Sequence, residues 1–249
     1  MSSTTTWPTF MAKLMERQEV ANRTLALRFE KPADSPFTPG QFVEVTLMNP
    51  AETDAEGNSR VFSIASAPHE SFLMVTTRLR DTAFKRTLRT MPLSAEVRIE
   101  GPFGDLRLHK NQARPAVFLA GGIGITPIRS IVLHAAKQKL PHRIFLFYSN
   151  RRPEDAAFLQ ELDALQQENR NYRFIPTMTE MEKSQAHWQG ETGHFTPGML
   201  TKYLKPASPD ATPIYYLTGP PGMVSGVRAM LIGAGIDEDD IRTEEFSGY

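Results

Sequence analysis

The pattern of hydrophobic residues changes near the middle of the chain, and this change is the strongest constraint on its fold. From residue 11 to about 108, short apolar runs are separated by turn residues such as Pro39-Gly40. Beyond Pro115, apolar runs of strand length alternate with stretches that have helical spacing. Short strands between turns predict an antiparallel barrel or sandwich. Alternation of strand and helix predicts a parallel sheet covered on both faces.

The two halves predict two domains, residues 1–110 and 111–249, that meet in a polar linker near residues 108–114. Strands of the first domain are expected at 20–29, 42–47, 60–64, 72–79 and 97–99, with a helix at 82–90. Strands of the second are expected at 116–120, 143–148, 172–176 and 214–217. Its helices are expected at 127–139, 154–168, 197–204 and 222–232. The fold class is therefore an antiparallel β domain followed by an α/β domain.

The composition excludes several classes of site. The 249-residue chain contains no cysteine, so it offers no disulfide, no cysteine-ligated zinc or iron–sulfur site and no cysteine nucleophile. Its six histidines lack metal-binding spacing, and we expect no metal site. Lys+Arg and Asp+Glu are equal at 28 each, which argues against nucleic-acid binding. Without a secretory signal or an apolar run of about 18 residues, we expect a cytoplasmic protein with no membrane span.

A glycine-rich turn, Gly121-Gly-Ile-Gly-Ile-Thr-Pro127, joins the first strand of the second half to a helix. Gly122 and Gly124 let the backbone turn sharply and approach a pyrophosphate without interference from a Cβ. Thr126 is expected to cap the helix and Pro127 to occupy its first position, so that unpaired N–H groups face an anion. A purely structural glycine turn is the alternative, and the flanking strand and helix favour the dinucleotide site.

Two more predicted strands end at the same sheet edge. One runs into Ser149-Asn150-Arg151-Arg152, with no carboxylate before Glu154. Here an acidic residue suits the 2′-hydroxyl of NAD(H) and a basic one the 2′-phosphate of NADP(H), so the sequence favours NADP(H). The alternative is that both arginines are solvated residues ahead of a helix. The other strand runs into Gly219-Pro220-Pro-Gly-Met223, and two glycine turns on one edge indicate a dinucleotide crevice.

Six motifs, in order, resemble those of the ferredoxin–NADP reductase family of flavoprotein oxidoreductases. They are R-x-[YF]-S at 60–63, G-P-x-G at 101–104, G-G-x-G-x-T-P at 121–127, Y-S-x-R at 148–151, G-P-P-x-M at 219–223 and E-x-[FY] at 244–246. Together they cover about residues 11–249. The resemblance implies a six-stranded antiparallel FAD-binding barrel and an NADP-binding parallel-sheet domain whose C-terminal tail returns to the flavin. This agrees with the periodicity.

The resemblance assigns the flavin to the motif Arg60-Val61-Phe62-Ser63. Arg60 would contact the flavin pyrophosphate, Phe62 would lie against the isoalloxazine, and Ser63 would hydrogen-bond at flavin N5. Ordinary barrel core is the alternative for Phe62.

The resemblance places the phosphate-binding helix start at Ala83, Phe84 and Lys85. Most relatives carry small residues there, so the larger side chains put a side-chain role in question, while backbone amides could still serve. Thr77 and Arg78 are further cofactor-binding candidates, with solvated barrel positions as the alternative.

The C-terminal residues carry the last resemblance. In the family an aromatic residue covers the flavin face that nicotinamide must occupy, with an acidic residue beside it, and Phe246 and Glu244 match that spacing. Tyr249 is a second candidate for this ring, otherwise packing near the FAD adenine. Thr218 stands where many relatives have cysteine, near the place where nicotinamide meets the flavin, and we expect it to shape the site.

The expected function is that of an FAD-dependent NADPH oxidoreductase. NADPH would reduce FAD by hydride transfer, which requires only close approach of the reacting atoms. Electrons would leave singly for ferredoxin, flavodoxin or another acceptor protein. The alternatives are a reductase component of an oxygenase, a reductase of free small molecules such as flavin, and, from another class, a non-catalytic nucleotide-binding module. The presence of Arg60, Ser63, Gly124 and the second glycine turn argues against the last.

Overall fold

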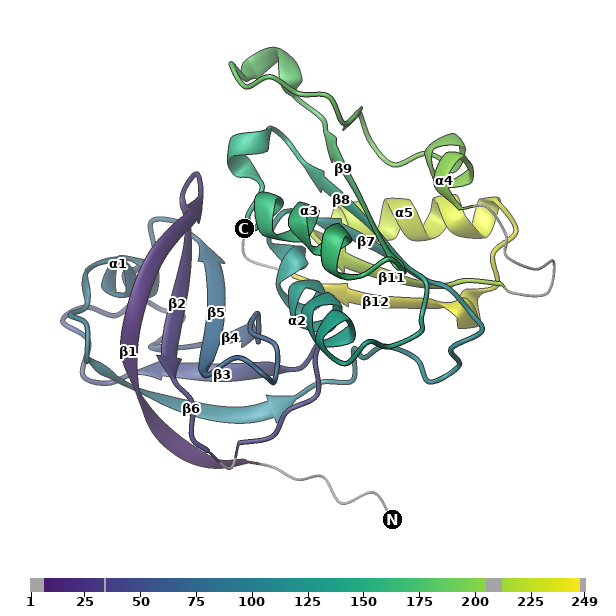
Figure 1. The fold of residues 1–249 in the computed structure, drawn as a ribbon. Helices are drawn as coiled ribbons and strands as arrows, with labels where there is room; N and C mark the ends of the chain where they lie inside the picture. The colour runs from purple at the N-terminus through teal and green to yellow at the C-terminus, as the bar shows by residue number, and fades with distance from the viewer. Residues whose placement is uncertain (1–6, 34, 205–211, 247–249) are drawn as a thin grey trace.

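The first half of the chain forms a six-stranded antiparallel sheet that curls into a barrel (Figure 1). The computed structural model describes residues 7–33, 35–204 and 212–246. The strands are β1 (Trp7–Ala21), β2 (Thr24–Glu30), β3 (Phe42–Leu47), β4 (Ser59–Ser63), β5 (Phe72–Arg78) and β6 (Glu96–Phe103), in the order β4-β3-β6-β1-β2-β5. The first part of β1 pairs with β6 and the second with β2, and a register shift between Leu14 and Glu16 bends the strand into the barrel.

The barrel closes between its two edge strands, β4 and β5. One bridge joins Ile64 to Val75, and the Ala65 N–H donates to the Met74 carbonyl. No other pairing between these two edges occurs in the part of the chain that the structure describes, so a seam remains beside Ser63. Helix α1 (Ala83–Thr90) follows β5 and places Phe84 and Leu88 in the barrel core.

The second half forms a sheet whose described pairs are all parallel, in the order β10-β9-β8-β7-β11-β12. The strands are β7 (Ala116–Gly121), β8 (Ile144–Asn150), β9 (Tyr172–Met178), β10 (Glu191–Thr192), β11 (Ile214–Gly219) and β12 (Ile241–Glu245). The helices are α2 (Ile125–Lys137), α3 (Leu159–Glu168), α4 (Pro197–Tyr203) and α5 (Pro221–Gly233). Short 3₁₀ turns lie at Gly122–Gly124, Pro153–Asp155, Met181–Lys183 and Glu238–Asp240.

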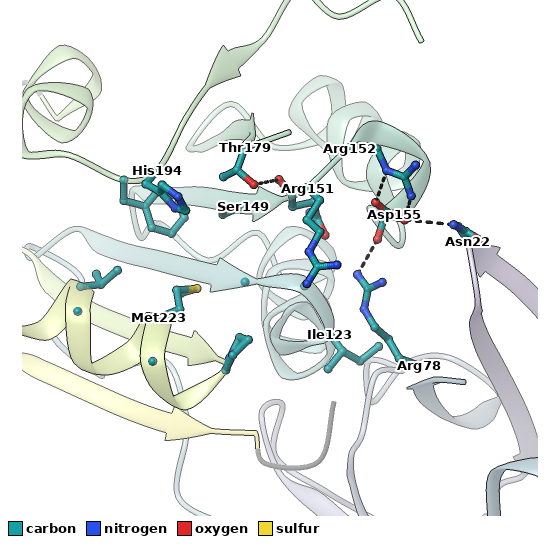
Figure 2. Close-up of a pocket in the computed structure, with 18 of the residues that line it drawn as sticks. Asn22, Arg78, Ile123, Ser149, Arg151, Arg152, Asp155, Thr179, His194 and Met223 are labelled. Atoms are coloured by element: carbon teal, nitrogen blue, oxygen red, sulfur yellow. Dashed lines mark hydrogen bonds and ion pairs between the residues drawn. The ribbon is translucent and has the colours of Figure 1, made fainter. Parts of the chain in front are cut away.

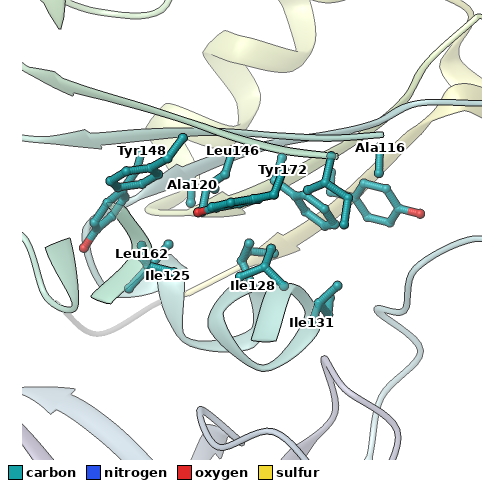
Figure 3. Close-up of a cluster of buried hydrophobic side chains, with 14 of the residues drawn as sticks. Ala116, Ala120, Ile125, Ile128, Ile131, Leu146, Tyr148, Leu162 and Tyr172 are labelled. Carbon is teal, nitrogen blue, oxygen red and sulfur yellow. The ribbon is translucent and has the colours of Figure 1, made fainter. Parts of the chain in front are cut away.

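Alternate side chains of these strands enter two cores. On one face, Ala120 and Leu146 pack with Ile125 and Ile128 of α2, and α3 contributes Leu162 (Figure 3). The other face packs against α4 and α5. Because both faces are covered, the central strands β7, β8 and β11 are buried and largely apolar, and this explains the continuous apolar runs in their sequence.

The connections change direction at β7. From β7 the chain proceeds to β8 and β9 on one side, and it returns to place β11 on the other. Ligands of open α/β sheets bind beyond the carboxyl ends of the strands at such a switch point. The turns after β7 and β11 therefore share the position where a nucleotide would bind.

The fold class is confirmed, and two predicted elements are wrong in detail. The strand predicted at 20–29 is a hairpin: β1 ends at Ala21, and Arg23, with φ 53°, helps turn the chain into β2. The helix predicted at 154–168 begins at Leu159, because Phe158 has φ 60° and interrupts helical geometry. The domain boundary at residues 110 and 111 lies between β6 and β7 and remains a prediction.

Candidate functional site

The two glycine turns of the α/β domain pack directly against each other. A Cβ on Gly124 would lie 2.4 Å from the Thr218 carbonyl oxygen, and one on Gly121 would lie 2.1 Å from the Met223 sulfur. Gly122 and Gly219 have φ of 52° and 154°, a conformation that L side chains rarely adopt. Glycine is therefore required here by close approach as well as by backbone conformation.

The start of α2 differs from the prediction. The helix begins at Ile125 after a 3₁₀ turn, with Gly124 at the N-cap, so the prediction of Thr126 as N-cap is wrong. Thr126 is buried and its hydroxyl donates to the Ile123 carbonyl, and Pro127 lies inside the first turn rather than at its start. The 3₁₀ turn supplies the first turn of the helix, and a side-chain cap is not needed.

A pocket of about 970 Å³ lies between the two domains, over these turns (Figure 2). Eight predicted cofactor-binding residues line it: Arg78, Gly122, Ser149, Asn150, Arg151, Arg152, Pro220 and Met223. Gly124, Thr126, Pro127 and Gly219 do not line it, and the two glycines lie where the two turns pack together. The pocket thus brings together three strand ends that are far apart in the sequence.

Apart from Arg78, sequence reasoning missed the barrel side of this pocket. Asn22, Arg23 and Arg80 line it from the barrel, and Thr179 and His194 from the segments that follow β9 and β10. None of these belongs to a recognisable motif. The residues after β9 lie in a stretch whose sequence indicates no regular element, so its position beside the pocket became evident only from the fold.

The two arginines that follow β8 have different surroundings. Arg152 is paired with buried Asp155, at 2.8 Å from Nε to Oδ2 and 3.1 Å from Nη2 to Oδ1. Asp155 also accepts from the Asn22 amide at 3.4 Å, and its carbonyl accepts from Arg78 at 2.9 Å. Arg151 points into the pocket (Figure 2), its side chain is 76% exposed, and the carboxylate of Glu180 lies 3.8 Å from its guanidinium. Arg151 can therefore receive a phosphate, whereas Arg152 fixes the loop.

The flavin motif lies on the barrel, outside this pocket. Arg60 donates to the carbonyls of its own loop, pairs with Asp54 and Glu56, and lies over the Phe84 ring. Phe62 packs against the same ring, with centroids 5.9 Å apart. Val61 faces solvent, while Ser63 is buried.

The start of α1 already holds an anion from the chain itself. The Asp54 carboxylate accepts from the Ala83 N–H at 2.9 Å and lies 3.3 Å from the Arg60 guanidinium. The helix start that was predicted to bind phosphate therefore does bind a negatively charged group. The sequence of the acidic loop 51–58 did not indicate that this loop would supply that group. Lys85 is half-buried beside it, and burial, with smaller contributions from neighbouring cations, lowers its pKa to about 8. Thr77 is buried and donates to the Arg78 carbonyl.

The predicted catalytic residues of the second domain lie side by side on adjacent strands. Thr218 of β11 is in register with Glu244 of β12, and the Phe246 N–H donates to the Gly219 carbonyl at 3.0 Å. The Thr218 hydroxyl and Glu244 Oε2 are buried without a hydrogen-bond partner among the described residues. Burial raises the pKa of Glu244 to about 7. Tyr249 lies outside the described residues.

Replacing Glu244 with glutamine is expected to change how stability depends on pH. The folded-state pKa of Glu244 lies above the ordinary value of 4.5. The contribution of this carboxyl to the free energy of unfolding is therefore fully present below about pH 4.5 and is lost as pH rises through about 7. Glu244→Gln should therefore match wild type near pH 4 and exceed its Tm by about 2–4 °C at pH 8. Thermal unfolding across this range measures the difference. The control is Glu245→Gln at an exposed position, and equal curves for both variants would contradict the assignment.

Among the described residues, no helix is long and apolar enough to cross a membrane, and no cluster of His, Asp and Glu could hold a metal ion.

Comparisons with known proteins agree with this geometry. The family described as "Oxidoreductase NAD-binding domain" matches residues 118–229. One subunit of the Na(+)-translocating NADH-quinone reductase of Methylococcus capsulatus is 33% identical over 156 residues, which are 61% of this chain and 37% of that protein. The chain thus spans well under half the length of this curated relative.

Solved structures share the whole fold. A ferredoxin NADP+ reductase from Neisseria gonorrhoeae with bound FAD and NADP is 20% identical, with a TM-score of 0.77 over 95% of this chain and 98% of that one. A flavohemoglobin from Malassezia yamatoensis with bound FAD and heme is 22% identical, with a TM-score of 0.79 over 96% of this chain and 60% of that one. The chain therefore has the fold of the ferredoxin–NADP reductases, and its second half matches an oxidoreductase NAD-binding domain over residues 118–229.

Proposed function

We propose that the protein oxidises NADPH through bound FAD and passes electrons singly to a carrier protein such as ferredoxin or flavodoxin. The observation that carries this proposal is the pocket itself. It opens over two glycine turns at a topological switch point and is bounded on its other side by the barrel that bears the flavin motif. A pocket shared by these two elements suits a reaction between two nucleotide cofactors.

Three features of the barrel support a fit to FAD. Ser63 lies at the end of β4 beside the seam, and its hydroxyl is buried with no partner among the described residues. Arg60 and the Ala83 N–H already bind the Asp54 carboxylate, so a pyrophosphate could take the same donors once Asp54 moves. The hydroxyl of Thr76, one strand away, is likewise buried without a described partner.

The residues of the chain have separate tasks in this proposal. The chemistry that bound FAD would supply is hydride acceptance from a nicotinamide and release of single electrons. Arg60 and the start of α1 hold its pyrophosphate, and Ser63 and Thr218 offer hydroxyls to the reacting rings. Gly122 lets the dinucleotide approach the backbone closely, and Gly219 lets the two glycine turns pack together. Glu244, with its pKa near 7, holds or releases a proton beside Thr218.

The relatives support a second candidate, a reductase subunit that uses NADH and serves a larger complex. The curated relative named above is a subunit of an NADH-quinone reductase, and another similar structure is a cytochrome P450 reductase from Amycolatopsis. Arg151, exposed at the pocket beyond β8, favours NADPH over NADH. Acceptor and nicotinamide preference together distinguish the two candidates.

An anaerobic spectrum tests the proposal. Protein supplied with FAD should show flavin absorbance in the visible range after gel filtration, and addition of NADPH should bleach it. Adding oxidised ferredoxin or flavodoxin should then restore the flavin spectrum. Protein that retains no flavin, or a flavin that NADPH leaves oxidised, would overturn the proposal. Faster reduction by NADH, with transfer to a quinone or oxygenase partner, would favour the second candidate.

Phe246 is proposed to cover the place of the nicotinamide, and Phe246→Ala tests this role. Its backbone is anchored to the dinucleotide turn by the bond to Gly219, which places the residue beside that turn. Stacking of one ring contributes about 0.5–1.5 kcal/mol, so its removal should strengthen the nicotinamide–flavin charge-transfer band and raise kcat/KM for NADH about 2- to 10-fold. Steady-state kinetics with both nucleotides measure this. Deletion of Tyr249 should chiefly weaken FAD retention, and if that deletion alone alters nicotinamide binding, the two roles are reversed.

A further inference from the structure

Arg129 of α2 is almost completely buried, with 3% exposure, yet the sequence marks it as nothing more than a residue of an amphipathic helix. Every N–H of its guanidinium donates a hydrogen bond. Nε and Nη2 donate to Glu161 of α3 at 2.7 and 2.6 Å. Nη1 and Nη2 donate to Glu70 at 2.9 and 3.1 Å, and Nη1 also donates to the Ala65 carbonyl at 2.7 Å.

These partners belong to two different domains. Glu161 lies within the α/β domain, whereas Glu70 and Ala65 lie in the barrel segment that connects β4 to β5. The neighbouring residue repeats the connection, because the Ser130 hydroxyl donates to the Ser66 carbonyl at 2.7 Å and both side chains are fully buried. The Ser66 hydroxyl in turn accepts from the Met74 N–H at 3.0 Å. Arg129 and Ser130 thus hold the 64–70 segment against α2.

The connected segments directly follow the two cofactor motifs. The barrel segment begins where the flavin motif ends at Ser63, and α2 begins directly after Gly124 of the glycine turn. A displacement at this contact would therefore move one motif relative to the other. Phe158 adds an apolar contact at the same place, because its ring lies 5.1 Å from the Arg129 guanidinium carbon and packs against the barrel residues Ala65 and Met74.

We propose that Arg129 is a positioning residue that sets the separation of the flavin and the nicotinamide by clamping Glu70 and Ala65 to the dinucleotide-binding helix. The inference rests on the proposed function. Hydride transfer needs the reacting atoms about 3–3.5 Å apart, and displacements of about 1 Å are enough to slow such steps by two orders of magnitude. A planar guanidinium with donors on both sides suits this task, because a lysine cannot bridge two carboxylates and a carbonyl in one plane.

The structure supplies a matched pair of variants. Glu70→Gln weakens the ion pair of Arg129 that crosses between the domains. Glu161→Gln weakens the ion pair of Arg129 that lies within the α/β domain. Both remove one carboxylate charge opposite the same guanidinium. We expect Glu70→Gln to reduce the nicotinamide–flavin charge-transfer band and kcat about 10-fold, with dissociation constants for FAD and NADP+ within about 2-fold of wild type. Glu161→Gln should leave the band and kcat near wild type.

Arg129→Lys and hydrogen exchange complete the test. Arg129→Lys keeps the positive charge but loses the planar set of guanidinium donors. This variant should therefore show less than half of the wild-type charge-transfer band. Amide exchange in the protein without added nucleotides should quicken over residues 64–70 in Glu70→Gln, most at Ala67, whose N–H donates to Glu70 at 2.6 Å, and not in Glu161→Gln.

Distinct outcomes separate this inference from the proposed function. If wild-type protein gives no charge-transfer band, the proposed function fails and the positioning role fails with it, whatever exchange shows. If the wild-type protein gives the charge-transfer band, equal losses of this band in Glu70→Gln and Glu161→Gln would overturn the positioning role. Arg129 would then act only on stability. A loss of FAD affinity that matches the loss of kcat in Glu70→Gln would also overturn it, because Glu70 would then act on flavin binding alone.

Discussion

Gly124→Ala is expected to raise the dissociation constant for the nicotinamide dinucleotide about 100-fold or more and to lower the free energy of unfolding by about 1–3 kcal/mol. The added Cβ would lie 2.4 Å from the Thr218 carbonyl oxygen and 2.7 Å from the Gly219 nitrogen. Both are backbone atoms at the end of a buried strand, so no side-chain rotation can relieve the contact. The two glycine turns must move apart, and the pocket floor changes shape. Calorimetric titration and denaturant unfolding measure the two effects.

Gly222→Ala is the matched control. Gly222 also lines the pocket, in the first turn of α5, but a Cβ there would meet nothing within 4 Å, and its backbone needs no left-handed conformation. We expect unchanged dinucleotide affinity and a gain in stability of up to about 1 kcal/mol, because alanine restricts the unfolded chain. Equal loss of binding in both variants would show that any added volume disturbs the site. Normal binding by Gly124→Ala would contradict the assignment of this turn to the dinucleotide.

Features that depend on a residue and its immediate neighbours were predictable from the sequence. The glycine turns are an example, because a missing Cβ and a free φ are properties of the residue itself. The apolar strands β7 and β8 and the pattern of α2 follow in the same way from periodicity. The order of these elements then places the three strand ends at one sheet edge, where the pocket is found.

Features that depend on a partner far away in the sequence were not predictable. Arg129 is a charged residue at a position of α2 that the sequence pattern assigns to the exposed face of the helix. Its burial becomes evident only in the fold, where Glu70 of the barrel lies beside it. Asp54 belongs to a loop whose acidic sequence predicts exposure to solvent. The barrel fold places this loop beside the start of α1. In both cases the partner is more than fifteen residues away, and local propensity contains no record of it.

Boundaries failed where two local preferences competed. Thr126 is a good N-cap residue, but the glycines before it form a 3₁₀ turn that starts the helix earlier. Residues 154–168 have helical periodicity, but the contact of Phe158 with the barrel core is accompanied by a left-handed conformation that delays the helix to Leu159. A local turn therefore set the first boundary, and a contact between the domains accompanies the second.

Arg151→Ala is expected to raise KM for NADPH about 10- to 100-fold and to change KM for NADH less than about 2-fold. The loss of one charge-assisted phosphate contact is worth about 1.5–3 kcal/mol, and NADH has no phosphate at this position. Arg152→Ala should behave differently, although the sequence gives the two arginines the same role. Its guanidinium is paired with Asp155, so its removal frees the loop that also holds Asn22 and Arg78, and KM should rise for both nucleotides.

Arg170→Ala controls for the loss of one positive charge, because Arg170 is exposed and precedes β9, at the end of the sheet opposite the pocket. Steady-state kinetics with both nucleotides compare the three variants. If Arg151→Ala raises both KM values equally, the residue shapes the pocket and does not recognise the 2′-phosphate. If only Arg152→Ala raises KM for NADPH without raising KM for NADH, the roles of the two arginines are exchanged. The 2′-phosphate must then break the ion pair between Arg152 and Asp155 in order to bind. The pattern of a selective Arg151 and a non-selective Arg152 follows from one difference in the structure: one arginine faces the pocket, and the other already has its carboxylate.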